Sequence, residues 1–210
     1  MPGYELIGFS EKEEVNKVFD SGGILFRHSF DKLRSDCYQV KKFEKNFSLF
    51  LGGQKCLAVT SGTAALRVAL AALDIGLGDE VITQSFTFVA TVEAIVESRA
   101  TPICANIDET LNLDPKKFEE LITEKTKAVI LVHMLGVPCD IKPILEICRK
   151  YNLKVIEDTA WGCGGSLNNV KLGTWGDIGT YSFDFAKTIT TGEGGMLTFK
   201  NEEIYNKALA

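Results

Sequence analysis

The sequence predicts an α/β fold in which a mostly parallel, seven-stranded sheet lies between two layers of helices, giving three layers in the order α/β/α. Short apolar runs of four to seven residues alternate with segments whose apolar residues recur at helical spacing. These runs contain almost no polar residues, as is typical of parallel strands that helices cover on both faces. The chain has 210 residues, which is enough for one large domain or two small ones.

The elements follow one another as strand and helix through most of the chain. The run CLAV at 56–59 leads into GTAALRVALAAL at 62–73, where apolar residues recur every three or four positions. Asp114 is a good helix-capping residue, and Pro115 suits the first position of the helix that follows it. We expect the antiparallel member of the sheet to be the final strand. The expected strands are 56–59, 80–83, 101–107, 127–133, 154–158, 178–183 and 195–199, with helices at 62–73, 91–99, 114–122 and 141–151.

The first 50 residues do not follow this alternation. Amphipathic patterns predict one helix within 10–23 and another within 36–53, each followed by glycines. A further helix is expected from Asn201 onward. We therefore divide the chain into an N-terminal helical arm, 1–50, and a large ligand-binding domain, 51–210.

Composition excludes several classes of function. The net charge is −5, and no basic stripe interleaved with aromatic residues indicates a nucleic-acid partner. The longest apolar stretch, 128–137, is too short to span a bilayer, so no membrane partner is expected. The first 14 residues lack the apolar core of a signal peptide. A cytoplasmic location is the resulting expectation.

The six cysteines indicate neither a disulfide framework nor a metal site. None forms a C-x-x-C pair, and His28 and His133 fall at no zinc-ligand spacing, so no metal is expected. Cys104 and Cys148 lie in apolar patterns, where cysteine usually serves as a small buried hydrophobic residue. Cys163, next to two glycines, is the thiol that we single out for reactivity.

Small polar residues follow the first strand. In parallel α/β sheets ligands bind beyond the carboxyl ends of the strands, which is where the segment TSGTAAL opens a helix. Free amides at such a helix start form an anion site, to which Ser61 and Thr63 can add hydroxyl groups beside Gly62. The alternative is an ordinary helix cap. No G-x-G-x-x-G or Walker pattern occurs, so dinucleotides and nucleoside triphosphates are poorly supported.

Two aromatic residues, Phe86 and Phe88, follow the second strand at the same edge of the sheet. Core packing is the commoner fate of phenylalanine, and a flat ligand stacked on one ring is the other interpretation.

A carboxylate and a lysine complete the set of polar groups at this edge. Asp158 ends an apolar strand, where an unpaired carboxylate is costly and requires a cation; a helix cap or a structural ion pair is the alternative. Lys187 follows another strand, five residues after Ser182, and precedes a glycine-rich turn; by itself it reads as a solvated residue at a strand end. A phosphate, a flat cationic ring and an aldehyde on one molecule would match all of these groups. Pyridoxal phosphate (PLP) has these parts.

Together these segments resemble the DegT/DnrJ/EryC1/StrS family of sugar aminotransferases, a branch of the fold-type I PLP enzymes. The resemblance runs from about residue 12 to the end of the chain. It implies the large domain of that fold, with PLP as cofactor. The segments that carry it are SGTAALRVALAAL, GDEVITQSFTFVAT, ATPICANID, KTKAVILVHMLG, VIEDTAWGCGG, GDIGTYSF and AKTITTGEGG.

The resemblance also implies roles for individual residues. Lys187 would attach the cofactor covalently and later move the proton between the substrate carbon and the cofactor, and Asp158 would keep the pyridine nitrogen protonated. The amides of Gly62 and Thr63, with the Ser182 hydroxyl, would hold the phosphate.

Phe88 would stack on the ring. Trp161 stands where the family often has Gln or His against the cofactor's phenolic oxygen, and Thr188 stands where Asn is common. The implied substrates are a nucleotide-linked keto-sugar and an amino-acid donor, usually glutamate.

Family members continue beyond this length with a segment that reaches the partner subunit and a smaller C-terminal domain. We therefore expect a homodimer with weak cofactor binding and little turnover by these 210 residues. One alternative is a PLP-dependent deoxysugar dehydratase, which the lysine at 187 argues against because that enzyme has a histidine there. Another is a truncated, non-catalytic PLP-binding or dimerisation module.

Overall fold

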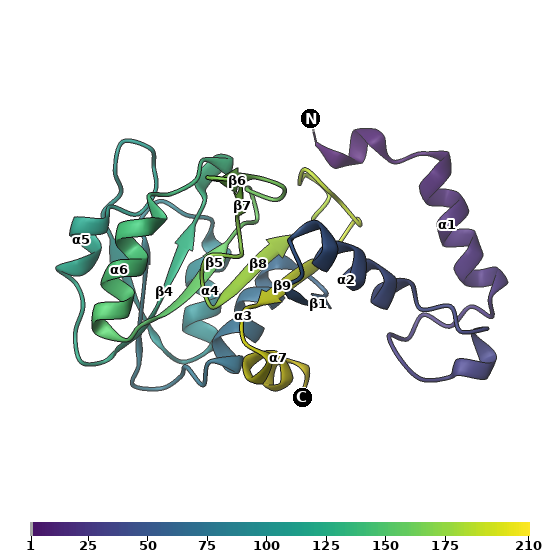
Figure 1. The fold of residues 1–210 in the computed structure, drawn as a ribbon, viewed down its shortest axis with the longest axis horizontal. Coiled ribbons are helices and arrows are strands. Elements are labelled where there is room, and N and C mark those ends of the chain that lie inside the picture. The colour runs from purple at the N-terminus through teal and green to yellow at the C-terminus, as the bar shows by residue number, and fades with distance from the viewer. Residues whose placement is uncertain (1) are drawn as a thin grey trace.

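The computed structural model describes residues 2–210 and contains a seven-stranded sheet with the order β1-β9-β8-β5-β4-β2-β3 (Figure 1). The predicted fold class is confirmed, and each predicted strand ends within two residues of the observed one. The strands are β1 (Lys55–Val59), β2 (Glu80–Gln84), β3 (Thr101–Ala105), β4 (Thr126–Val132), β5 (Lys154–Asp158), β8 (Ile178–Ser182) and β9 (Gly195–Phe199).

The antiparallel strand of the sheet is β9, as predicted. It lies between β1 and β8 and pairs with both in the antiparallel sense, whereas the pairs among β3, β2, β4, β5 and β8 are parallel. The carboxyl ends of β1, β2, β4, β5 and β8 consequently meet at one edge of the sheet, together with the start of β9.

A short hairpin, β6 (Ser166–Leu167) and β7 (Val170–Lys171), was not expected. Strands of two residues are too short to show an apolar pattern. The signal for the hairpin is its turn, because Asn168 and Asn169 both have positive φ angles, at 50° and 64°, and asparagine tolerates this conformation better than most residues.

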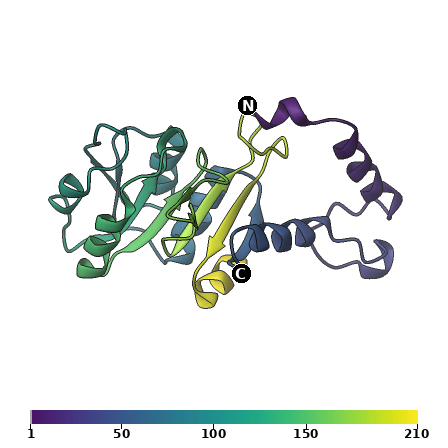
Figure 2. The same cartoon turned by 45° about the horizontal axis from the view of Figure 1, so that its top comes forward.

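Helices cover both faces of the sheet (Figures 1 and 2). In β4, Ala128 and Ile130 pack into one core cluster, and Val129 and Leu131 pack into another on the opposite face. This two-sided burial explains why the strand sequences are continuously apolar. One face carries α3 (Gly62–Ala72), α4 (Val89–Glu97) and α7 (Glu202–Leu209); the other carries α2 (Gln39–Phe50), α5 (Pro115–Glu119) and α6 (Ile141–Tyr151). Among the helices of residues 2–210, none is long and apolar enough to cross a membrane.

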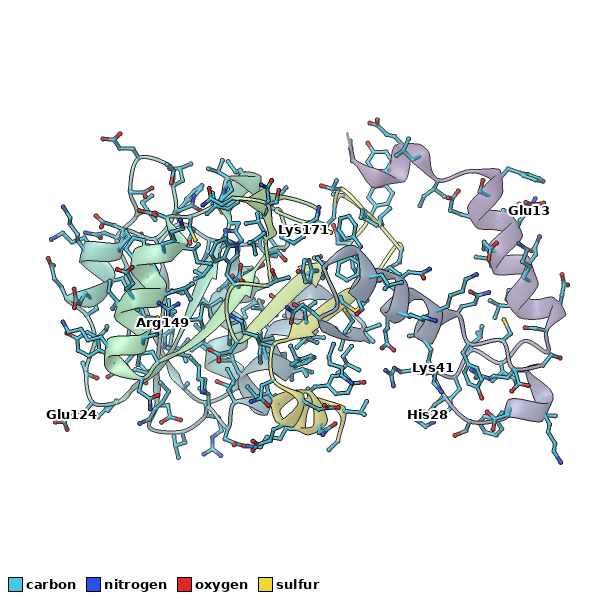
Figure 3. The ribbon with its side chains drawn as sticks, viewed as in Figure 1. Glu13, His28, Lys41, Glu124, Arg149 and Lys171 are labelled. Atoms are coloured by element: carbon cyan, nitrogen blue, oxygen red, sulfur yellow. The ribbon has the colours of Figure 1, made fainter. Side chains whose placement is uncertain are left out.

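The N-terminal segment extends away from the sheet before it returns through α2. Its elements before α2 are the 3₁₀ turn η1 (Gly3–Leu6), helix α1 (Phe9–Asp20) and the 3₁₀ turn η2 (Asp31–Leu33). Helix α1 has no buried residue, and Figure 3 shows Glu13 and His28 on the side of the molecule opposite Glu124 and Arg149. Helix α2 does contribute to the core, since its Phe47 packs edge-on against Tyr181 of β8. The division into 1–50 and 51–210 stays a prediction.

The structure corrects two expectations about cysteines. Cys104 is exposed rather than buried, because β3 is an edge strand and helices leave that position uncovered. Cys163 is not primed for reaction, since burial raises the pKa of its thiol to about 11. Cys148 is buried, as expected.

Candidate active site

A cavity of about 330 Å³ opens at the carboxyl edge of the sheet, between the start of α3, the ends of β5 and β8 and the loop that follows β8. This volume falls in the range of small-molecule sites. The structure brings eight residues singled out in the sequence to this one cavity: Ser61, Gly62, Thr63, Phe88, Asp158, Trp161, Ser182 and Lys187.

The start of α3 presents unpaired donors to the cavity. Ser61 is the N-cap, and its hydroxyl oxygen accepts the Ala64 amide at 3.0 Å. The helix-cap interpretation is therefore correct for that oxygen, and the Ser61 hydroxyl hydrogen remains able to donate. Across residues 2–210, no protein acceptor takes the amides of Gly62 and Thr63. Free amides at the positive end of a helix form an anion site.

Gly62 allows this helix start to lie directly against β8. A Cβ atom at Gly62 would stand 2.8 Å from the Ser182 Cβ and 3.1 Å from the Ser182 Oγ. Real side chains do not tolerate the shorter distance, so any larger residue would push α3 away from Ser182. The close approach places the Ser182 hydroxyl next to the free amides.

Asp158 ends β5 with its side chain almost fully buried. The Thr91 hydroxyl donates to Asp158 Oδ2 at 3.2 Å, and the Ala160 amide donates to Oδ1 at 3.0 Å. Burial nevertheless raises the pKa of the Asp158 carboxyl above its ordinary value of 3.8, which these hydrogen bonds and the Lys187 ammonium only partly oppose. A cation placed against this carboxylate would be strongly held.

Lys187 lies in the loop between β8 and β9, half-buried. Its amine nitrogen stands 3.9 Å from the centroid of the Trp161 ring, within the range of a cation–π interaction. Burial lowers the pKa of the Lys187 amine, while the carboxylates of Asp158 and Asp184 act in the opposite direction. Lys187 is therefore not the freely solvated lysine that its local sequence suggests.

The two aromatic residues after β2 differ in position. Phe88 lies immediately before the first residue of α4, lines the cavity and has 62% of its surface exposed, so it is accessible to a ligand in the cavity. Phe86 is also exposed, at 43%, but lies outside the cavity lining.

Several polar residues near the site were missed in the sequence, including Asp184 and Glu193, which line the cavity. Thr91, one turn into α4, is buried and accounts for one of the two hydrogen bonds to Asp158. Glu157 and His133 are completely buried and paired at 3.1 Å beneath the carboxyl ends of β4 and β5. The sequence feature that could have indicated this buried pair is Glu157 itself, an acidic residue inside an otherwise apolar strand.

Glu157 organises the chain that leads into β8. Its Oε1 accepts the amides of Trp175 at 2.6 Å and Gly176 at 2.7 Å, and its Oε2 accepts the amide of Gly173 at 2.8 Å. His133 Nδ1 accepts the Cys139 amide at 3.2 Å, so the ring proton lies on Nε2 and is donated to Glu157.

The cavity thus combines an anion-binding helix start, a buried carboxylate that requires a cation, an exposed aromatic ring and an amine with a lowered pKa.

Comparison with solved structures identifies proteins built on the same fold. An aminotransferase from Psychrobacter cryohalolentis superimposes with a TM-score of 0.88 at 36% identity, over 97% of this chain and 50% of that one. NtdA from Bacillus subtilis, solved with the cofactor PMP bound, superimposes with a TM-score of 0.84 at 34% identity, over 97% of this chain and 45% of that one. The fold is that of the PLP-dependent aminotransferases.

Sequence comparison is more specific. The profile of the DegT/DnrJ/EryC1/StrS aminotransferase family matches residues 27–210. The chain is 42% identical to the spore coat polysaccharide biosynthesis protein SpsC of Bacillus subtilis, over 96% of this chain and 50% of SpsC. It is 42% identical to GDP-perosamine synthase of Escherichia coli O157:H7, over 95% of this chain and 52% of that protein. The chain belongs to the DegT/DnrJ/EryC1/StrS aminotransferase family, whose members depend on PLP, and it spans about half the length of these curated relatives.

Proposed function

We propose that this chain is the cofactor-binding part of a PLP-dependent aminotransferase that moves an amino group from glutamate to a nucleotide-linked keto-sugar. The observation that carries the proposal is the meeting of Lys187, Asp158 and the free amides of α3 in one cavity. Each of these groups matches a different part of the same cofactor.

The start of α3 fits the phosphate. The Gly62 and Thr63 amides and the Ser61 and Ser182 hydroxyls would hold it, because all four groups line the cavity next to the positive end of the helix. The close contact between Gly62 and Ser182 leaves no room there for a larger side chain.

Asp158 fits the protonated ring nitrogen. A buried carboxylate with a raised pKa gains most from a nearby cation, and its hydrogen bonds from Thr91 and Ala160 fix the direction in which it can accept. Phe88 and Trp161 line the same cavity and provide the aromatic surfaces for a flat ring.

Lys187 supplies the amine and the proton transfer. An ordinary lysine, with a pKa of about 10.4, is neutral only about once in a thousand molecules at pH 7.4. Burial lowers the pKa of Lys187 and so increases the neutral fraction that can act as nucleophile and base. When bound, PLP supplies a ring that accepts negative charge from the substrate carbon next to the amine. Once the amino donor has displaced Lys187 from the cofactor, the freed Lys187 amine would take the proton from that carbon and deliver it to the cofactor.

The names of relatives support the choice of substrate. They include GDP-perosamine synthase and dTDP-3-amino-3,6-dideoxy-alpha-D-galactopyranose transaminase, the latter 38% identical over 92% of this chain. Glutamate as donor, a homodimer and a cytoplasmic location remain predictions that rest on the family resemblance and on composition.

The test is covalent trapping. The purified chain is incubated with PLP, reduced with borohydride and digested, and the modified peptide is identified by mass spectrometry. We expect the label on Lys187, its loss in Lys187→Ala, and no change in the matched control Lys127→Ala, an exposed lysine in β4. Labelling at full yield in Lys187→Ala would refute the assignment. Adding glutamate and following conversion of the cofactor to its amine form separates an aminotransferase from a non-catalytic binding module.

A further inference from the structure

The start of the chain lies on the loop that carries Lys187. Figures 1 and 2 both show η1 next to the loop between β8 and β9, residues 183–194, which we call the Lys187 loop. The Gly3 amide donates to the carbonyl oxygen of Lys187 itself, at 2.7 Å. This contact joins the first turn of the chain directly to the main chain of the proposed catalytic residue.

Gly3 fits this position because it has no side chain. It is buried, and a Cβ atom there would stand 2.9 Å from the Thr188 carbonyl oxygen and 3.1 Å from both the Lys187 oxygen and the Thr190 nitrogen. All three atoms belong to the backbone, so they cannot swing aside as a flexible side chain would. Close packing of backbone on backbone leaves little freedom in how the two segments meet.

A second contact follows immediately. The Tyr4 ring stacks on the Phe185 ring with centroids 4.4 Å apart and planes 8° from parallel. Phe185 lies two residues before Lys187. The ring stack and the hydrogen bond therefore hold the loop at two points that are separated only by Ala186. Gly3 and Tyr4 together form what we call the N-terminal clasp.

The rest of the loop is secured mainly at its base. The Phe183 carbonyl accepts the Thr191 amide at 3.0 Å and the Thr190 hydroxyl at 3.1 Å, which closes the loop where it joins the sheet. At the apex, Phe185, Ala186, Thr188 and Ile189 are exposed. Within residues 2–210, the apex is otherwise held only by a turn, in which the Asp184 carbonyl oxygen accepts the Lys187 amide at 3.0 Å and the Asp184 carboxylate accepts the Ala186 amide at 3.0 Å.

We propose that the N-terminal clasp positions the Lys187 loop, so that Gly3 and Tyr4 hold the Lys187 amine over the Trp161 ring and inside the cavity. Gly3 and Tyr4 are positioning residues, because they act through the loop and do not line the cavity. The expected effect on the rate of PLP attachment rests on the proposed function. The expected effect on the pKa of the Lys187 amine does not.

The first experiment uses the protein without cofactor. Lysines are labelled in competition with acetic anhydride across a pH series, and peptide mass spectrometry gives the titration of each amine. In the wild-type chain Lys187 should titrate below the ordinary value of 10.5, because burial lowers its pKa against the opposing charges of Asp158 and Asp184. Glu193 also lines the cavity and is kept in every variant.

Two variants open the clasp and two serve as controls. In Tyr4→Ala and in Gly3→Ala, the Lys187 titration should move up toward the ordinary value as the amine reaches solvent. Tyr4→Phe keeps the stack and should restore the wild-type titration. Tyr151→Ala removes a tyrosine of nearly the same exposure, 40% against 39%, on α6, and should leave Lys187 unchanged. Thermal unfolding identifies any variant that has lost its fold.

The second readout is the rate at which PLP forms its visible absorbance band with the protein. Loss of one aromatic stack should slow this rate between about twofold and tenfold in Tyr4→Ala, with recovery in Tyr4→Phe. An unchanged Lys187 titration in folded Tyr4→Ala and Gly3→Ala would overturn the proposal. A shifted titration without borohydride trapping at Lys187 would uphold the clasp and refute the proposed function.

Discussion

Replacing Glu157 with glutamine tests whether the hydrogen bonds to this buried carboxylate stabilise the folded protein beneath the site. The two carboxylate oxygens accept three backbone amides and the His133 ring proton. Glutamine keeps the shape but turns one acceptor oxygen into an NH₂ group that faces two donors. Two hydrogen bonds to a charged acceptor contribute about 3–6 kcal/mol together.

Part of this loss is offset because a neutral amide is easier to bury than a carboxylate. We therefore expect Glu157→Gln to lower the free energy of unfolding by about 2–4 kcal/mol, which is a large share of the 5–15 kcal/mol typical of a folded domain. For a chain of this size the melting temperature should fall by roughly 4–16 °C.

The measurement is urea and thermal unfolding of the cofactor-free protein, followed by circular dichroism. Glu124→Gln, on the exposed turn before β4, is the matched control and should change the unfolding free energy by less than about 0.5 kcal/mol. If the free energy of unfolding of Glu157→Gln lies within about 1 kcal/mol of the wild-type value, the hydrogen bonds to Glu157 do not stabilise the chain that leads into β8.

Three further predictions concern the site and the thiols. Because burial raises the pKa of Asp158, the folded state binds a proton there more tightly than the unfolded state, so stability contributed by this group falls as pH rises from about 3.8 through the raised pKa. Without cofactor at neutral pH, Asp158→Asn should therefore have a higher free energy of unfolding than wild type, and the difference should shrink toward low pH. The variant should also bind PLP about 10- to 150-fold more weakly. A difference in unfolding free energy that does not change with pH would contradict the expected effect on stability. Gly62→Ala should weaken binding of PLP and of inorganic phosphate in calorimetry and lower the free energy of unfolding by about 1–3 kcal/mol. The control Gly76→Ala, whose Cβ would stand 3.4 Å from its nearest neighbour, should do neither. Equal effects of the two variants would exclude the contact between Gly62 and Ser182 as the cause. A thiol reagent at mildly alkaline pH should modify exposed Cys104 well before buried Cys139, whose pKa is raised by burial, and the reverse order by mass spectrometry would show that β3 is covered.

Much of the site was predictable because its residues come directly after strands. Asp158 ends β5, Ser182 ends β8 and Ser61 follows β1, so a correct strand assignment places them at one edge of the sheet. The same reasoning was wrong for Cys104, because an apolar pattern indicates that a strand exists but does not indicate whether it lies at the centre or at the edge.

The remaining features depend on contacts between distant parts of the chain. Thr91 reaches Asp158 only because the first turn of α4 lies at the carboxyl end of β5, and Glu157 finds its donors only because the chain returns past it before β8. Partial burial of Cys163, which raises the pKa of its thiol, likewise comes from packing that its glycine neighbours do not indicate.

By itself, the sequence determined the order of strands and helices, the residues at the strand ends and the family, because apolar periodicity and short motifs are local properties of the chain. The tertiary structure alone decided which side chains satisfy the buried carboxylates and that Gly3 and Tyr4 hold the Lys187 loop. The physical reason is that hydrogen bonds and ring stacking require proximity in space. Local sequence patterns record which face of an element is buried, and they do not record which partner it meets.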